Sequence, residues 1–231
     1  YKAYIRIGLF ISAVLALMGM TFSGTRTAYA MVPAGLALYF ILTMDNPKTI
    51  IFGIIGAAAI GLLLFGPFYG GHFTRIKSLV NADEDPSMNV RNVNRDRVQP
   101  YIQSNPMGGG LVTTGTIGLE YSAGHPLAGF PPDSGYLATA LETGWIGLIL
   151  EMIFLATVLI VGVNNYFKTR DPTIRNLYCA YLSSLFALTV ANYAQDALYQ
   201  KPIGLIVFTS FILMIKLYEF DKQIQHDSSS A

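Results

Sequence analysis

The sequence is poor in charged residues and in cysteine. Only 13% of its 231 residues are Asp, Glu, Lys or Arg, about half the share that is usual in soluble domains. The net charge of +1 provides no basic field for nucleic acid, so we expect no nucleic-acid partner. The single cysteine, Cys179, excludes an intrachain disulfide and a cysteine-rich metal site.

Signatures of several enzyme classes are also missing. The sequence contains no HExxH and no GxSxG motif. The glycines at 108–110 are not followed by the Lys-Ser/Thr pair of a phosphate-binding loop. The histidines of the long polar stretch, His72 and His125, have no metal-ligand spacing with another His, Cys or acid. The sequence therefore predicts no metal site.

Apolar residues, in contrast, are abundant. They make up 52% of the chain, the mean hydropathy is +0.45, and they occur in long runs. Since a membrane-spanning helix needs about 20 such residues, we expect an all-α integral membrane protein with about six transmembrane helices. The expected spans are 4–22, 28–43, 49–68, 135–163, 177–198 and 203–217.

These spans divide the chain into four regions. Three membrane helices are expected in 1–68, one large loop in 69–134, three more helices in 135–217, and a polar, frayed tail in 218–231. A span begins almost at the first residue, which we interpret as the C-terminal portion of a longer protein. Lys and Arg gather in alternate connections, so the positive-inside rule places those connections and the tail in the cytoplasm and the large loop outside.

Arginines on the outer side are candidates for binding an anion, because a guanidinium holds phosphate bidentately. Arg26 follows the first span, where the charge rule argues against it; the alternative is an arginine in a tight turn that reaches for the interface. In the loop, Arg91 and Arg95 are four residues apart and would share one face of a helix. That face is either a phosphate site or a solvated surface.

Three further features are open to a functional or a structural interpretation. Gly109, in the run 108–110, could present backbone N–H groups to a ligand or form a flexible turn. Asp196 ends a polar cluster that indicates either an outward cavity or an interfacial helix end. Asp133 and Glu142 flank the start of the fourth span, about 13 Å apart along a continuous helix, so they do not form a carboxylate dyad unless the backbone bends.

Three elements resemble those of the O-antigen ligase and O-antigen polymerase superfamily. Ser23–Arg26 lies at the outer end of a span, with another span directly after it. The segment 105–110, Asn-Pro-Met-Gly-Gly-Gly, is similar to the family's "hP.GhG" element. Asp133-Ser134-Gly135-Tyr136-Leu137, followed by Glu142, Gly144 and Gly147, is similar to "HNxYLxxLxExGxxG".

The resemblance implies a multi-pass, GT-C-like glycosyltransferase of the bacterial inner membrane. Such enzymes transfer or polymerise a glycan from undecaprenyl diphosphate on the periplasmic face, to a glycan or lipid A-core acceptor. Membrane lipid surrounds them. Arg26 and Arg91 would then hold the diphosphate, and Asp133 would activate or orient the acceptor. Because arginines can stabilise the leaving diphosphate, we expect no metal and no cofactor.

The sequence departs from the family pattern at the candidate base. Asp133 stands where the family has a histidine, and histidine, with an ordinary pKa of about 6.5, suits base catalysis better than aspartate at about 3.9. His125, eight residues earlier, is the substitute candidate. Ala30 stands where ligases commonly have leucine, so ligase and polymerase both remain open. The alternative from another class is a transporter or flippase for a polyprenyl-linked glycan.

Overall fold

The structure is a computed structural model that describes residues 3–23, 26–65, 86–200 and 202–230. These residues form helices, and their only strand-like pairing is an isolated bridge between Gly115 and Ala128. The helices are α1 (Ala3–Ser23), α2 (Arg26–Leu42), α3 (Pro47–Phe65), α5 (Pro86–Ser104), α6 (Gly115–Tyr121), α7 (Gly135–Lys168), α8 (Pro172–Ala191) and α9 (Ile203–Ser230).

Four helices among the described residues are long and apolar enough to cross a membrane. They are α1, α7, α8 and α9, while the apolar parts of α2 and α3 are shorter. Such helices can enter lipid because their side chains are mostly apolar and because a helix satisfies all its backbone hydrogen bonds internally. The protein is thus an all-α, multi-pass membrane protein, and the expected crossings by α2 and α3 stay a prediction.

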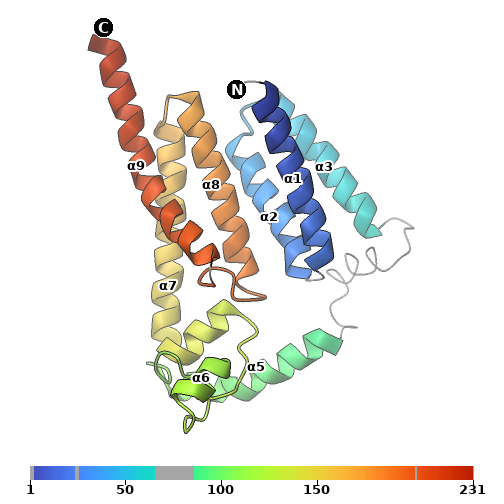
Figure 1. Ribbon diagram of the computed structural model, residues 1–231, viewed down its shortest axis with the longest axis vertical. Coiled ribbons are helices and arrows are strands. Elements are labelled where there is room, and N and C mark those ends of the chain that lie inside the picture. Colours follow the sequence, from blue (N-terminus) through green and yellow to red (C-terminus); the bar gives the residue numbers. More distant parts are fainter. Residues whose placement is uncertain (1–2, 24–25, 66–85, 201, 231) are drawn as a thin grey trace.

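The long helices alternate in direction (Figure 1). α5, α6 and the start of α7 lie at one end of the bundle, together with the end of α1 (Figure 1). At the other end, the α2–α3 connection meets the connection between α7 and α8. The Tyr166 hydroxyl donates to the Leu42 carbonyl at 2.7 Å, and Arg175 pairs with Asp45 at 3.6 Å. These two basic connections therefore share one end, in agreement with this part of the charge pattern.

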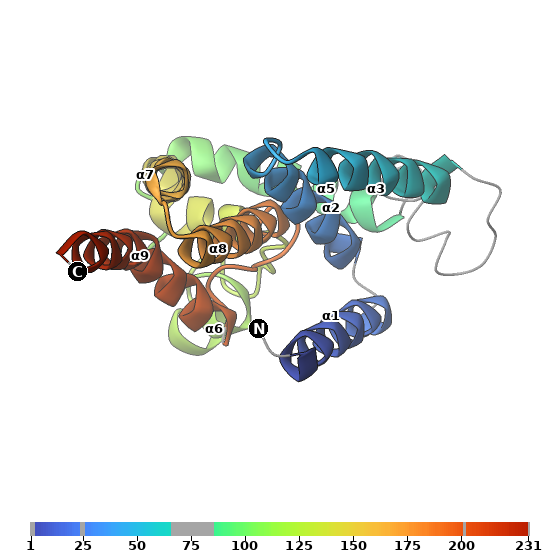
Figure 2. The same cartoon turned by 90° about the horizontal axis from the view of Figure 1, so that it is seen from above.

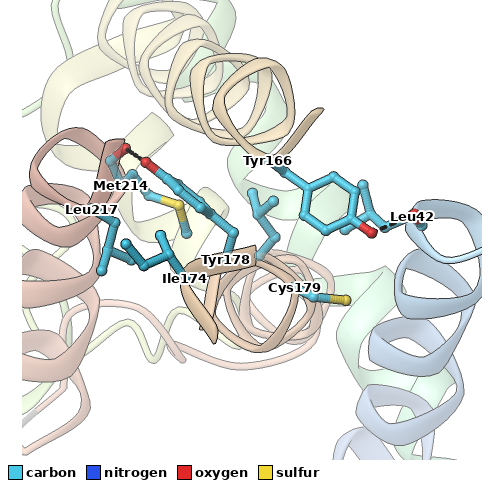
Figure 3. Close-up of a cluster of buried hydrophobic side chains, with 8 residues drawn as sticks. Leu42, Tyr166, Ile174, Tyr178, Cys179, Met214 and Leu217 are labelled. Atoms are coloured by element: carbon cyan, nitrogen blue, oxygen red, sulfur yellow. Dashed lines mark hydrogen bonds between the residues drawn. The ribbon is translucent and has the colours of Figure 1, made fainter. Parts of the chain in front are cut away.

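α8 is the central helix of the bundle, with α2, α7 and α9 around it (Figure 2). A buried cluster joins these four helices (Figure 3). In it the Tyr178 hydroxyl donates to the Met214 carbonyl at 2.7 Å. Such apolar contacts with satisfied hydroxyl groups hold α2 together with the three helices that follow the large loop.

Two expected helix ends were wrong. The span predicted to reach residue 198 ends at Ala191. The tail predicted to fray instead continues α9 through Ser230. Asp221 in this extension is fully buried and accepts backbone N–H bonds from Arg170 and Asp171, the latter at 2.8 Å. The C-terminal extension of α9 therefore binds the backbone of the connection between α7 and α8.

α5 lies across the end of the bundle, at a steep angle to the long helices (Figure 1). It packs on the start of α7 through a small buried cluster of Val98, Leu127 and Leu141, with Tyr101 beside it. Arg91 and Arg95 both lie on α5, four residues apart and therefore on one face of the helix. This packing brings the large loop against the first turns of α7.

Candidate functional site

The first half of α7 is broken at Gly144, where the backbone has φ 73° and ψ −179°. This conformation is essentially restricted to glycine. A Cβ at Gly144 would overlap the Pro106 carbonyl oxygen, and one at Gly108 would overlap the Gly144 nitrogen. The two glycine-containing elements of the sequence thus meet backbone to backbone.

Hydrogen bonds fix this contact. The break frees the Leu141 and Glu142 carbonyls of α7, and they accept from the N–H groups of Gly109 (2.8 Å) and Gly110 (2.9 Å). Gly109 was singled out because its N–H could bind an anion; that N–H is already used. A Cβ on Gly109 would also lie 2.6 Å from His125 Cε1 and 2.7 Å from the Tyr101 hydroxyl. Gly109 therefore docks the loop, and the reason for assigning it to substrate is lost.

Glu142 ties the same loop to α7 by its side chain. Its Oε1 accepts from the Thr114 hydroxyl at 2.7 Å and from the Thr114 N–H at 3.4 Å. Glu142 therefore braces the loop against α7. Because Thr114 holds one oxygen, the orientation of the carboxylate is fixed.

Two cavities open beside Glu142. One, of about 560 Å³, lies between the 111–117 segment, the first turns of α7 and residues 196–200. The other, of about 600 Å³, runs along α7 to Glu151 and is lined mainly by apolar side chains. Both include Glu142, Thr143 and Tyr199 in their walls. Their sizes are typical of small-molecule sites.

The wall formed by residues 196–200 is shaped by Asn192, which is fully buried just after α8. Its Oδ1 accepts from the N–H groups of Ala197 (3.0 Å) and Leu198 (3.3 Å), and its carbonyl accepts from Gly135 (3.0 Å) and the Ser134 hydroxyl (3.1 Å). A Cβ at Gly135 would overlap the Asn192 side chain. This junction places Asp196 in the wall of the smaller cavity.

Tyr199, next in this wall, binds a carboxylate of α7. Its hydroxyl donates to Glu151 Oε1 at 2.8 Å. Partial burial, with the Glu151 carboxylate as its hydrogen-bond partner, raises the pKa of the Tyr199 phenol above its ordinary value. The phenol therefore stays a neutral donor at physiological pH.

α5 connects Asp133 with the arginines. Asn94 donates to Asp133 Oδ2 at 3.4 Å. The next residue, Arg95, donates to the Tyr193 hydroxyl at 3.0 Å, and its guanidinium lies 4.8 Å from the centre of the Tyr193 ring. Arg91 is one turn earlier on the same helix. One helix thus carries two arginines to the region where α7 begins and α8 has ended.

His125 lies elsewhere in the loop. Its Nδ1 accepts from the Leu127 N–H at 3.2 Å, and its Nε2 lies 3.4 Å from the Tyr101 hydroxyl. In the neutral imidazole this network leaves the proton on Nε2, facing Tyr101. Since Tyr101 and Asn94 are seven residues apart on α5, their side chains are separated by about 10 Å along the helix. Asp133 is therefore bonded to the helix that carries Arg95, whereas His125 lies next to Gly109.

The remaining candidate, Arg26, is the first residue of α2, and its side chain lies outside the described part of the chain. Among the described residues, no group of three His, Cys, Asp or Glu side chains could hold a metal ion.

Several residues of this region were not singled out by sequence reasoning. Asn94, Thr114 and Tyr199 are common polar residues, and nothing in their spacing marks the partners that they contact. Tyr193 had a weak signal, since it stands inside the polar cluster that ends at Asp196. Their importance comes from contacts between distant segments.

Comparison with known proteins gives a family match. Residues 11–152 match the family model described as O-antigen ligase. No curated protein and no solved structure gives a significant match. The family match covers more than half of the chain and includes the glycine contact, Glu142 and Asp133. The resemblance stated from the three sequence elements is confirmed, and the chain belongs to the O-antigen ligase family.

Proposed function

We propose that this protein transfers or polymerises a glycan carried on undecaprenyl diphosphate, at the periplasmic face of the bacterial inner membrane. The family match supports glycan transfer in a membrane. The observation that carries the finer proposal is the placement of α5, which links Asp133 through Asn94 and presents Arg95 beside Tyr193. A carboxylate and two arginines at one junction suit a base and a diphosphate clamp.

The arginines act on the donor. Arg91 and Arg95 bind the diphosphate, joined by Arg26 at the start of α2. A guanidinium has five N–H donors in a fixed plane. Contact with the Tyr193 hydroxyl uses one of them, so Arg95 is oriented while most of its donors remain for phosphate oxygens. These contacts strengthen as the leaving diphosphate gains charge.

Asp133 acts on the acceptor. Its carboxylate takes the proton of an acceptor hydroxyl as that oxygen attacks the anomeric carbon of the donor sugar. The bond between that carbon and the diphosphate oxygen breaks, and undecaprenyl diphosphate leaves with the electron pair. Asn94 holds one carboxylate oxygen, which orients the other. His125 has a structural role in the loop, since both of its ring nitrogens have hydrogen-bond neighbours there.

The orientation rests on the basic connections, which lie at the end of the bundle away from α5. The positive-inside rule then puts α5 and the junction in the periplasm. A transporter or flippase would use the same arginines without requiring Asp133.

Gene deletion with complementation tests the proposal. Lipopolysaccharide from the deletion strain is separated by electrophoresis. Uncapped core identifies the ligase step, and core carrying a single repeat identifies the polymerase step. Purified protein should also move the glycan from isolated lipid-linked donor to acceptor without ATP, and this separates transfer from transport. Unchanged lipopolysaccharide together with no transfer in vitro would refute the proposal.

A further inference from the structure

The smaller cavity beside Glu142 has a polar wall that the transfer mechanism does not use. We propose that this cavity of about 560 Å³ is the acceptor-sugar subsite, and that it accepts an uncharged or amine-bearing sugar and excludes an anionic one. This inference rests on the proposed function, because it names the substrate class of the same enzyme.

The wall offers the groups that bind sugar hydroxyls. Glu142 and Asp196 supply carboxylate oxygens, Gln200 supplies an amide, and Tyr199 supplies a phenol. Carboxylates and amides can each bond two neighbouring hydroxyls, and an aromatic ring offers an apolar face. Glu142 is oriented in advance by Thr114, which lowers the cost of binding.

A second observation points to a ligand with hydrogen-bond donors. In the adjoining cavity, Glu151 Oε1 accepts from Tyr199, while Glu151 Oε2 is buried and has no hydrogen-bond partner among the described residues. A buried carboxylate oxygen without a donor is costly. Because Tyr199 lines both cavities, a hydroxyl or amine of a bound saccharide that extends past it would satisfy this oxygen.

Charge decides which sugar fits. The described residues that line the smaller cavity include two carboxylates and no lysine, arginine or histidine. Two carboxylates at roughly 7 Å from an added negative charge disfavour it about tenfold even with the dielectric constant of water, and more with weaker screening. Arg95 of α5 contacts Tyr193, outside this lining, so the diphosphate and the acceptor sugar have separate sites.

The cavity is next to the proposed base. Pro132 and Gly135, on either side of Asp133 and Ser134, both line it. The segment that turns Asp133 towards Asn94 therefore also forms part of the cavity wall. A sugar in the cavity would have a hydroxyl close to the start of α7, where the proposed transfer takes place.

Binding of free disaccharides, without donor lipid, tests the inference. The full chain in lipid nanodiscs is titrated at pH 7 with cellobiose, its 2-amino derivative and cellobiouronic acid. Binding of each disaccharide is measured by saturation-transfer NMR. We expect the dissociation constant of cellobiouronic acid to be at least about tenfold above that of cellobiose. The amino derivative should bind as well as cellobiose or better. The same order of affinities is expected in Lys201→Gln. This control removes the positive charge next to Gln200, because Lys201 lies outside the described residues.

Variants locate the site and its charge preference. The isosteric double variant Glu142→Gln, Asp196→Asn should reduce the tenfold difference to less than about twofold. Ala138→Phe fills the cavity and should abolish binding, while Ala156→Phe, at an exposed position of α7, should not. Asp133→Asn should bind disaccharides normally, so loss of transfer and loss of this site are distinguishable.

Equal or tighter binding of the anionic disaccharide would overturn the charge preference. Failure of all three disaccharides to bind, or unchanged binding by Ala138→Phe, would overturn the subsite itself.

Discussion

Replacing Gly144 by alanine should open the contact between the large loop and α7. At φ 73° and ψ −179° a side chain is strained, and the new Cβ would overlap the Pro106 carbonyl oxygen. Relief requires the 106–110 segment to move away, which breaks the bonds from Gly109 to Leu141 and from Gly110 to Glu142. Strain of about 1–3 kcal/mol and two bonds of about 0.5–1.5 kcal/mol each give a total of about 2–6 kcal/mol.

Hydrogen exchange of the purified protein measures this cost directly. A loss of 2 kcal/mol or more makes protected amides exchange at least about 30-fold faster, provided that they exchange by local opening. We expect this acceleration in peptides that cover Gly109 and Gly110, with little change in peptides from α8. Trp145, the only tryptophan, adjoins the break and should report the opening by a shift of its emission.

The matched control is Gly56→Ala in α3, where nothing lies within 4 Å of the added Cβ. It should leave the loop peptides as protected as in the wild type. If Gly144→Ala also keeps full protection of Gly109 and Gly110, the backbone contact does not hold the loop, and the reasoning fails.

Four further predictions concern the proposed transfer. Asp133→Asn should lower turnover about 10²–10⁴-fold in a transfer assay while donor lipid still binds, Asp133→His should restore part of it, and His125→Ala should change turnover little; a silent Asp133→Asn with an inactive His125→Ala would move the base to His125. Arg95→Lys loses the planar fork and should raise the KM for the lipid-linked donor about tenfold or more, whereas Tyr193→Phe keeps the ring beneath the guanidinium and should have a smaller effect. Arg26→Lys should lower activity strongly at unchanged expression, and near-normal activity of Arg26→Ala would remove Arg26 from the donor site. In a Cys179→Ser background, a membrane-impermeant thiol reagent should label Asn92→Cys and leave Lys168→Cys unlabelled in intact cells made permeable at the outer membrane; the reverse pattern would invert the orientation.

The sequence predicted what depends on local pattern. The spacing of Arg91 and Arg95 placed both on one face if the segment were helical, and α5 supplies that helix. Apolar runs located the long helices of the second half. The end of α8 was placed too late because Ala197 and Leu198 continue the apolar composition. In the structure the helix ends at Ala191, and the side chain of the next residue, Asn192, accepts hydrogen bonds from the N–H groups of Ala197 and Leu198.

Contacts between distant segments were beyond the sequence. The glycines of 108–110 suggested free N–H groups, and only the break at Gly144 shows which carbonyls they bind. The link from Asn94 to Asp133 joins residues 39 positions apart, and no local pattern encodes it. α9 continued beyond its apolar part because Asp221 finds backbone donors in another turn, which hydropathy does not register.

The 109–110 segment is attached to α7 by main-chain hydrogen bonds, so neighbouring side chains can be substituted while the attachment is kept. Gly109 and Gly110 dock through N–H groups that every residue except proline possesses, and Leu111 and Val112 beside them are exposed and face the cavities. Under the proposed function, substitutions at these two positions would therefore alter the saccharide preference while the attachment persists. Libraries that randomise Leu111 and Val112, with the glycines kept, offer a route to changing the sugar preference of the proposed acceptor subsite.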